Sequence, residues 1–291
     1  MIISFCMNKK IKRFLQAIFL NDVCWKIISP FIWLAERSKA SRRNYIEAPV
    51  IEMHEKKAWQ IFNDRIVKYG PFKGMYFGNA RPAADSIFSK LLGSYESELH
   101  PVFNRLLKND YKTIINIGCE DGYYAVGMAL RKPGVRLLAF DKDPAAVVHS
   151  KELAKMNKVN QQIEFLSICT EKNILELNKE ESMLLVVDCE GDEQYIFTRS
   201  TVSQLVNADM VIELHLHIYP ELEGYFKGLF AETHFISVVN SMDDHLKTLD
   251  YNIQELHGLD YATRRLIVGE RDIFMQWIIL ESKTSAGHNH G

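Results

Sequence analysis

The sequence predicts a Rossmann-like α/β fold: a doubly wound sheet of seven strands, mostly parallel with an antiparallel last strand, and an extra helical segment at the N-terminus. Short apolar segments rich in β-branched residues alternate with helical segments of about ten residues, which is typical of βαβ units in a parallel sheet. Because such crossovers are right-handed, helices are expected on both faces of the sheet. Two late strand-like segments, 234–239 and 273–280, favour an antiparallel pair that closes it.

The individual elements follow from changes in apolar periodicity along the chain. The other expected strands are 113–117, 136–140, 163–167, 183–188 and 210–214. The expected helices are 51–67, 96–108, 123–131, 144–157, 221–231 and 261–270. A long loop is expected over residues 70–85, which carry Gly70, Pro71, Gly74, Gly78 and Pro82.

These elements divide the chain into four expected segments. A basic helical segment covers residues 1–68, and a loop with helices that covers the ligand site follows over 69–110. The α/β domain extends over 111–281, and the polar tail 282–291 is expected to be disordered.

Charge and cysteine content narrow the function classes. The chain has a net charge of −2, yet residues 1–44 hold nine basic against two acidic side chains. The remaining body is therefore slightly acidic, which argues against a nucleic-acid partner, whereas the basic start could face an anionic surface. Five scattered cysteines form neither a disulfide framework nor a metal motif, and they suit a reducing, cytoplasmic compartment.

The apolar stretch 14–34 contains too many polar residues to span a membrane and lacks a small-residue cleavage site. It predicts two short amphipathic helices that meet near Asn21. Their apolar faces would pack on the domain or on a partner subunit, as in a homodimer. Alternatively, residues 8–43 would lie on the inner face of a membrane, with Trp25, Phe31 and Trp33 in the lipid.

A glycine turn follows the strand at 113–117. Gly118 and Gly122 are four residues apart, whereas a dinucleotide fingerprint needs glycine where this chain has Glu120 and Tyr123. A pyrophosphate would be repelled by Glu120 and Asp121, but the cationic sulfonium of S-adenosylmethionine would be attracted. The turn therefore favours S-adenosylmethionine over NAD.

Acidic and imidazole side chains follow the next strands. Asp141 comes 23 residues after Gly118, close to the spacing of a residue that accepts hydrogen bonds from a ribose diol. The alternative is that Asp141 or Asp143 only caps the helix at 144–157, and both roles are compatible if Asp143 is the cap. Asp188 and Glu190 end another strand.

The strand at 210–214 leads into a second polar group. Strand alternation places Glu213, His215 and His217 on one side, and a Glu in an apolar strand needs a partner.

In these segments the sequence resembles the FkbM-type family of class I S-adenosylmethionine-dependent methyltransferases. The resemblance covers roughly residues 95–280, with the run 93–96 just before it. Residues 116–122 match the family's cofactor loop, Asp141 its ribose strand, where Glu is more usual, and 188–191 its D-x-E-G signature. Asn116 stands where the loop usually begins with an acid, so Glu120 or Glu96 would replace that anchor.

The resemblance implies methyl transfer to a hydroxyl of a sugar or natural product, so the partner would be a small-molecule or glycan acceptor. The expected cofactor-binding residues are Gly118, Cys119, Glu120, Gly122, Tyr123, Asp141, Lys142, Cys169, Asp188 and Glu96. The expected catalytic residues are His215, Asp188 and Glu190, and the expected substrate contacts are Glu213, His217, Tyr95 and Arg81. His215 is the expected general base, unless it is a structural histidine.

Three alternatives remain open at this point. Asp188, Glu190, Glu213 and His215 could bind Mg²⁺ or Mn²⁺, but no compact ligand motif is present, so no metal is expected. The chain could instead be an NAD-linked oxidoreductase on the same sheet. It could also be a non-catalytic, methyltransferase-like scaffold held at a membrane surface.

Overall fold

The computed structural model describes residues 20–78, 86–271 and 273–284. The chain divides into two compact units, Met1–Lys56 and Lys57–Gly291, and the second contains the sheet. Arg81, one of the expected substrate contacts, lies outside the described residues.

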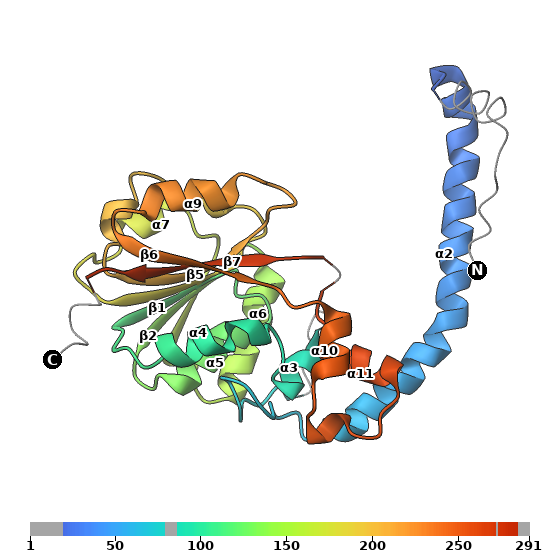
Figure 1. Cartoon of the computed structure of the whole chain (residues 1–291), viewed down its shortest axis with the longest axis horizontal. Coiled ribbons are helices and arrows are strands. Elements are labelled where there is room, and N and C mark those ends of the chain that lie inside the picture. Colours follow the sequence, from blue (N-terminus) through green and yellow to red (C-terminus); the bar gives the residue numbers. More distant parts are fainter. Residues whose placement is uncertain (1–19, 79–85, 272, 285–291) are drawn as a thin grey trace. The chain divides into compact units, whose positions relative to one another are not determined.

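The second unit is built on a seven-stranded sheet with the order β3-β2-β1-β4-β5-β7-β6 (Figure 1). The strands are β1 (Thr113–Ile117), β2 (Arg136–Phe140), β3 (Ile163–Leu166), β4 (Met183–Val187), β5 (Ala208–Leu214), β6 (His234–Asn240) and β7 (Gln276–Ser282). β1 to β5 pair in parallel, whereas β7 is antiparallel to both β5 and β6. This confirms the predicted fold class. β7 begins three residues later than expected and runs through Ser282.

The central strands are apolar throughout because successive residues alternate between two hydrophobic cores. Ile114 and Leu184 face one core, and Ile115 and Leu185 face the other. Figure 1 shows helices on both faces, with α4 (His100–Leu106) and α5 (Tyr123–Arg131) on one and α7 (Glu171–Leu175) and α9 (Leu222–Phe230) on the other. The sheet is therefore doubly wound, and its carboxyl edge is left open between the helix layers.

The remaining helical elements include several that the periodicity did not predict. They are α2 (Asp22–Ile61), α3 (Ile87–Leu92), α6 (Pro144–Met156), α8 (Glu193–Ile196), α10 (Asp244–Asp250), α11 (Tyr261–Val268) and the 3-10 turns η1 (Ser97–Leu99), η2 (Val202–Gln204) and η3 (Gln254–Leu256). α3 and α10 were missed, because six- and seven-residue helices are too short to show a clear period.

The N-terminal helical segment contains one long helix where several shorter helices were expected. From Asp22 onward α2 is one helix of 40 residues, which continues through Pro30 and Pro49. It replaces the second of the two short helices expected near Asn21 and the separate helix expected at 51–67; the first lies outside the described residues. Asn21 does mark a helix start, since its Oδ1 accepts hydrogen bonds from the amides of Val23 and Cys24 at 3.1 Å. None of the described helices is both long and apolar enough to cross a membrane.

The described part of the expected loop, residues 70–78, is packed rather than open. It folds back to pair Ile66 with Tyr76, and Phe72, Met75 and Phe77 are buried in the core. The rings of Phe72 and Phe77 contact Tyr123 at the start of α5, so this segment packs against that helix.

Candidate functional site

A cavity of about 470 Å³ opens at the carboxyl edge of the sheet, around the ends of β1, β2, β4 and β5. β1 lies between β2 and β4, so the chain reverses its strand order here, and this is where open α/β sheets bind ligands. Among the residues expected to form the site, those in the cavity wall are Tyr95, Gly118, Glu120, Asp141, Lys142, Cys169, Asp188, Glu190, Glu213, His215 and His217.

Position 118 requires a glycine because the backbone that follows β4 passes very close to it. The φ of Gly118 is 79°, and a Cβ at this position would lie 1.6 Å from the carbonyl oxygen of Asp188. The amides of Gly118 and Cys119 both donate to the carbonyl of Phe140 at 2.9 Å, which fixes the turn against β2. The turn after β1 thus contacts the ends of β2 and β4. A side chain at position 118 would clash with this backbone, so only glycine fits there.

The two carboxylates of the turn are not free, which corrects the electrostatic argument made from the sequence. The ammonium group of Lys90, on α3, donates to Asp121 Oδ2 at 2.8 Å and to Glu120 Oε2 at 3.1 Å. Burial alone would lower the pKa of Lys90, but the two acids together raise it. Asp121 also accepts from the amide of Tyr123 at 3.1 Å. The negative charge that faces the cavity therefore comes mainly from other residues.

Two roles, capping the helix α6 and accepting hydrogen bonds from a ribose, were expected for Asp141 and Asp143. Asp143 accepts from the amide of Ala145 at 2.9 Å and caps α6, as expected. Asp141 accepts from the amides of Glu120 and Asp143, both at 2.8 Å, and its carboxylate lies in the cavity wall. Each carboxylate oxygen can accept a second hydrogen bond, so Asp141 can still bind a diol.

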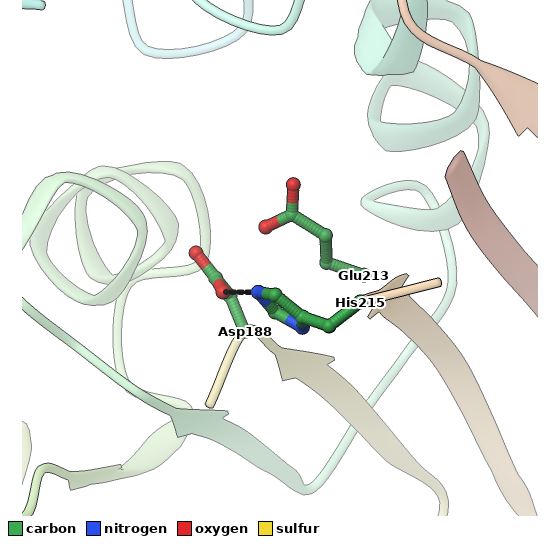
Figure 2. A group of neighbouring side chains, drawn as sticks. All are labelled: Asp188, Glu213 and His215. Atoms are coloured by element: carbon green, nitrogen blue, oxygen red, sulfur yellow. Dashed lines mark ion pairs between the residues drawn. The ribbon is translucent and has the colours of Figure 1, made fainter. Parts of the chain in front are cut away.

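At the opposite end of the cavity, His215 is held among carboxylates. Its Nδ1 lies 2.8 Å from Oε1 of the buried Glu193, and its Nε2 lies 3.5 Å from Glu190 Oε2 and 3.6 Å from Asp188 Oδ1. Figure 2 shows the ring directed at Asp188, with the carboxylate of Glu213 beside it. β4 and β5 thus bring three of the expected residues together in one cluster.

The carboxylates determine the protonation of this cluster. Burial by itself lowers the pKa of His215, but the neighbouring carboxylates of Glu190 and Glu193 raise it to about 10. Burial also raises the pKa of Asp188 and that of Glu213, which are in mutual contact. Without a bound cation, this raised pKa favours the protonated form of His215 at neutral pH.

Arg271 links two buried acids and was missed by sequence reasoning. It donates to Glu96 at 2.9 Å and to Glu213 at 3.1 Å, and its guanidinium lies over the ring of Trp277. Arg271 and Glu270 line the cavity, whereas Glu96 does not. The only trace of this residue in the sequence is that the charged pair Glu270 and Arg271 lies between the last helix and the last strand. The buried Glu in β5 does have the partner that it requires.

Other expected cofactor residues lie behind the wall. Tyr123 is buried among aromatic rings, with Phe72 at 5.1 Å and Tyr95 at 5.4 Å between ring centroids. Cys119 is buried beside Ser150, and Gly122 starts α5 with a φ of 88°. These residues shape the turn, but the structure does not bring them into the cavity.

Three acidic residues around the site have a left-handed backbone, which is uncommon outside glycine. The φ angles are 45° at Glu96, 44° at Glu120 and 59° at Glu190. Residues in such strained conformations concentrate at functional sites. Their clustering supports the assignment of this cavity as the functional one.

Comparisons with known proteins agree on the fold alone. No family profile matches the chain, and no curated protein matches it. Solved structures with a similar fold cover about two thirds of this chain at low sequence identity.

Three solved structures illustrate this likeness. The O-methyltransferase TomG from Streptomyces achromogenes, in complex with SAM, is 11% identical with a TM-score of 0.43, over 65% of this chain and 80% of that one. Precorrin-6y C5,15-methyltransferase from Geobacter metallireducens GS-15 is 11% identical with a TM-score of 0.42, over 63% of this chain and 89% of that one. MccD protein is 14% identical with a TM-score of 0.40, over 65% of this chain and 97% of that one.

Proposed function

We propose that this chain is an S-adenosylmethionine-dependent methyltransferase of the FkbM type that methylates a hydroxyl of a sugar or natural product. One observation carries the proposal. A single cavity at the switch point of the sheet has Gly118 and Asp141 at one end and the cluster around His215 at the other. One cavity would therefore bind the nucleoside near Asp141 and the positively charged sulfur near the carboxylates around His215.

The wall offers a group for each part of the cofactor. Asp141 would accept hydrogen bonds from the ribose hydroxyls, and the apolar Ile168 beside Cys169 would contact the adenine. Arg271 carries the positive charge that a methionine carboxylate needs, and its Nε has no hydrogen-bond partner among the described residues. Asp188 supplies negative charge toward a cationic sulfur.

S-adenosylmethionine, when bound, supplies a methyl group that is already activated, so the protein mainly has to align donor and acceptor. Glu193 holds the Nδ1 side of His215, which leaves Nε2 facing the cavity. Positive charge brought into the site lowers the pKa of His215 toward neutrality, and His215 can then take the proton of the acceptor hydroxyl. Glu190 is positioned to hold Nε2 after proton transfer.

Calorimetry with S-adenosylhomocysteine on the full chain tests the cofactor. We expect binding, and a loss of about 10- to 100-fold in affinity for Asp141→Asn, since hydrogen bonds to a charged group contribute about 1.5–3 kcal/mol. Asp110→Asn is the matched control, because Asp110 is exposed and lies outside the cavity wall. Tighter binding of NAD than of S-adenosylhomocysteine would instead favour the oxidoreductase.

We also propose that α2 contacts an anionic membrane surface. Exposed apolar side chains on its first turns include Ile27, Phe31 and Trp33; Lys26 lies among them, and further basic residues follow from Arg37 onward. The full chain should sediment with phosphatidylserine vesicles, and Phe31→Ser with Trp33→Ser should reduce this, whereas Tyr45→Ser should not. Dimers in solution without vesicle binding would favour the homodimer. Vesicle binding without any S-adenosylhomocysteine binding would favour the scaffold.

A further inference from the structure

We propose that Asp188, Glu213 and His215 form a binding site for one divalent cation of the Mg²⁺ or Mn²⁺ class, at the carboxyl ends of β4 and β5. Each of the three offers a ligand atom, and these atoms lie within 4.8 Å of one another. Given bonds of about 2.1 Å, two ligand atoms of such a cation lie about 4.2 Å apart when opposite and about 3.0 Å apart when adjacent, and only one of the three pairs can be opposite. The three side chains, drawn in Figure 2, therefore have to move together by up to about 2 Å to bind the ion.

His215 is oriented as a ligand. The side chain of Glu193, which is 0% exposed, holds Nδ1 at 2.8 Å and fixes the ring, so that Nε2 points to the acids. Imidazole ligands of metals characteristically have a carboxylate on their second nitrogen. The distances from Nε2 to Glu190 and Asp188, 3.5 and 3.6 Å, are longer than the 2.7–2.9 Å or so of a charge-assisted hydrogen bond. The space between these atoms suits an ion better than a direct pair.

The two carboxylates have coordination capacity left. Asp188 Oδ1 is buried and has no hydrogen-bond partner among the described residues. Leaving such an oxygen unpaired is unfavourable, and more so when the group is charged. Glu213 gives Oε1 to Arg271 at 3.1 Å, and its second oxygen remains for another ligand.

The charge of this end of the cavity also favours a cation. Asp188, Glu190, Glu193 and Glu213 surround His215, and Arg271 is shared between Glu213 and Glu96. One imidazole with several carboxylates is a donor set that Mg²⁺ and Mn²⁺ accept. The sequence contains no compact ligand motif because the donors come from two strands that are adjacent only in the folded sheet.

Metal binding does not depend on the proposed function, whereas its consequence does. With the ion bound, His215 Nε2 would be a ligand and no longer the general base, and the cation itself would polarise an acceptor hydroxyl and lower the pKa of that hydroxyl. This would limit the acceptor to one that can place an oxygen on the ion.

Electron paramagnetic resonance of Mn²⁺ titrated into the full chain tests the site directly. We expect one ion per chain, seen as loss of the free-ion signal, and a coupling to ¹⁴N of the bound imidazole by spin echo. Asp188→Asn and Glu213→Gln should each weaken binding at least tenfold. Asp192→Asn is the matched control, because it changes an acid of the same cavity wall that pairs with Lys142 instead.

The outcomes separate this site from the proposed cofactor. Asp141→Asn should lose S-adenosylhomocysteine and keep Mn²⁺. If the chain binds Mn²⁺ but never S-adenosylhomocysteine, the methyltransferase proposal fails and the metal site stands. Absence of Mn²⁺ binding, unchanged binding in both cluster variants, or bound Mn²⁺ without nitrogen coupling overturns the metal site. Thermal unfolding of each variant shows whether it is folded, and the nitrogen coupling needs no variant.

Discussion

Lys90 and Asp121 form an ion pair that is buried at both ends: the Nζ–Oδ2 distance is 2.8 Å, and the side chains are 1% and 6% exposed. The pair joins α3 to the turn after β1, so α3 helps to fix the position of this turn. Removing one partner leaves a charge inside the protein without compensation, which is costlier than removing both.

Lys90→Met should therefore lower the free energy of unfolding by about 3–5 kcal/mol, the usual cost of breaking a buried pair from one side. The double variant with Asp121→Asn should recover part of this loss. Urea denaturation followed by circular dichroism measures both. If the two single losses simply add in the double variant, the residues are not coupled and the turn is held by other contacts.

The glycine turn offers a second test with a built-in control. Gly118 and Gly134 both have left-handed backbones, with φ of 79° and 84°, but a Cβ on Gly134 would meet nothing within 4 Å. Gly134→Ala should cost only about 1–2 kcal/mol for the left-handed conformation.

Gly118→Ala should cost at least about 1–3 kcal/mol more, since its Cβ would displace β4. It should also abolish S-adenosylhomocysteine binding. Equal unfolding free energies for the two variants would show that β4 can move away without cost.

The sequence predicted those features that depend on neighbours along the chain. The strand β1 was visible as a β-branched apolar run, and Asp143 as a helix cap is a local interaction with Ala145. Strand ends at one edge of a parallel sheet must meet, so Asp188, Glu213 and His215 could be grouped without coordinates.

Partners far apart in the sequence could not be predicted in this way. Lys90 is 31 residues from Asp121, and Arg271 is 175 residues from Glu96. Charge alone does not tell a surface lysine from a buried one, so the turn acids were read as free. In α2, the single helix of 40 residues continues through Pro30 and Pro49, although proline removes a backbone donor from the helix interior.

His234 should make the stability of the fold sensitive to acid. Its Nε2 lies 2.8 Å from the carbonyl of Ala208, and burial lowers its pKa below the ordinary value of about 6.5. Between the folded and unfolded pKa values the unfolded chain binds more protons, so stability falls as the pH drops below about 6.5.

His234→Gln should flatten this slope of unfolding free energy against pH, measured by urea denaturation from pH 7.5 to 5. The exposed His257→Gln is the control and should leave the slope unchanged. A wild-type chain that is equally stable across this range would contradict the assignment of His234 as a buried neutral ring.

Glu193 should act on chemistry only through His215, as a positioning residue. Without divalent cations, desolvation lowers the pKa of His215, but the carboxylates of Glu190 and Glu193 raise it to about 10. NMR titration of the ring should therefore show it protonated at pH 8. Glu193→Gln removes one carboxylate and should lower this pKa by at least one unit, whereas Glu171→Gln, on α7 and outside the cavity wall, should not.

The same NMR titration, repeated with Mg²⁺ and S-adenosylhomocysteine present, tests whether His215 can act as the general base. Bound Mg²⁺ offsets the carboxylates or takes Nε2 itself, so the protonated ring should disappear at pH 8. A ring that titrates near 6.5 in the empty site would show that the acids around it are themselves protonated. His215 would then be competent as a base before any ligand binds, and the negative charge that we assign to this end of the cavity would be absent.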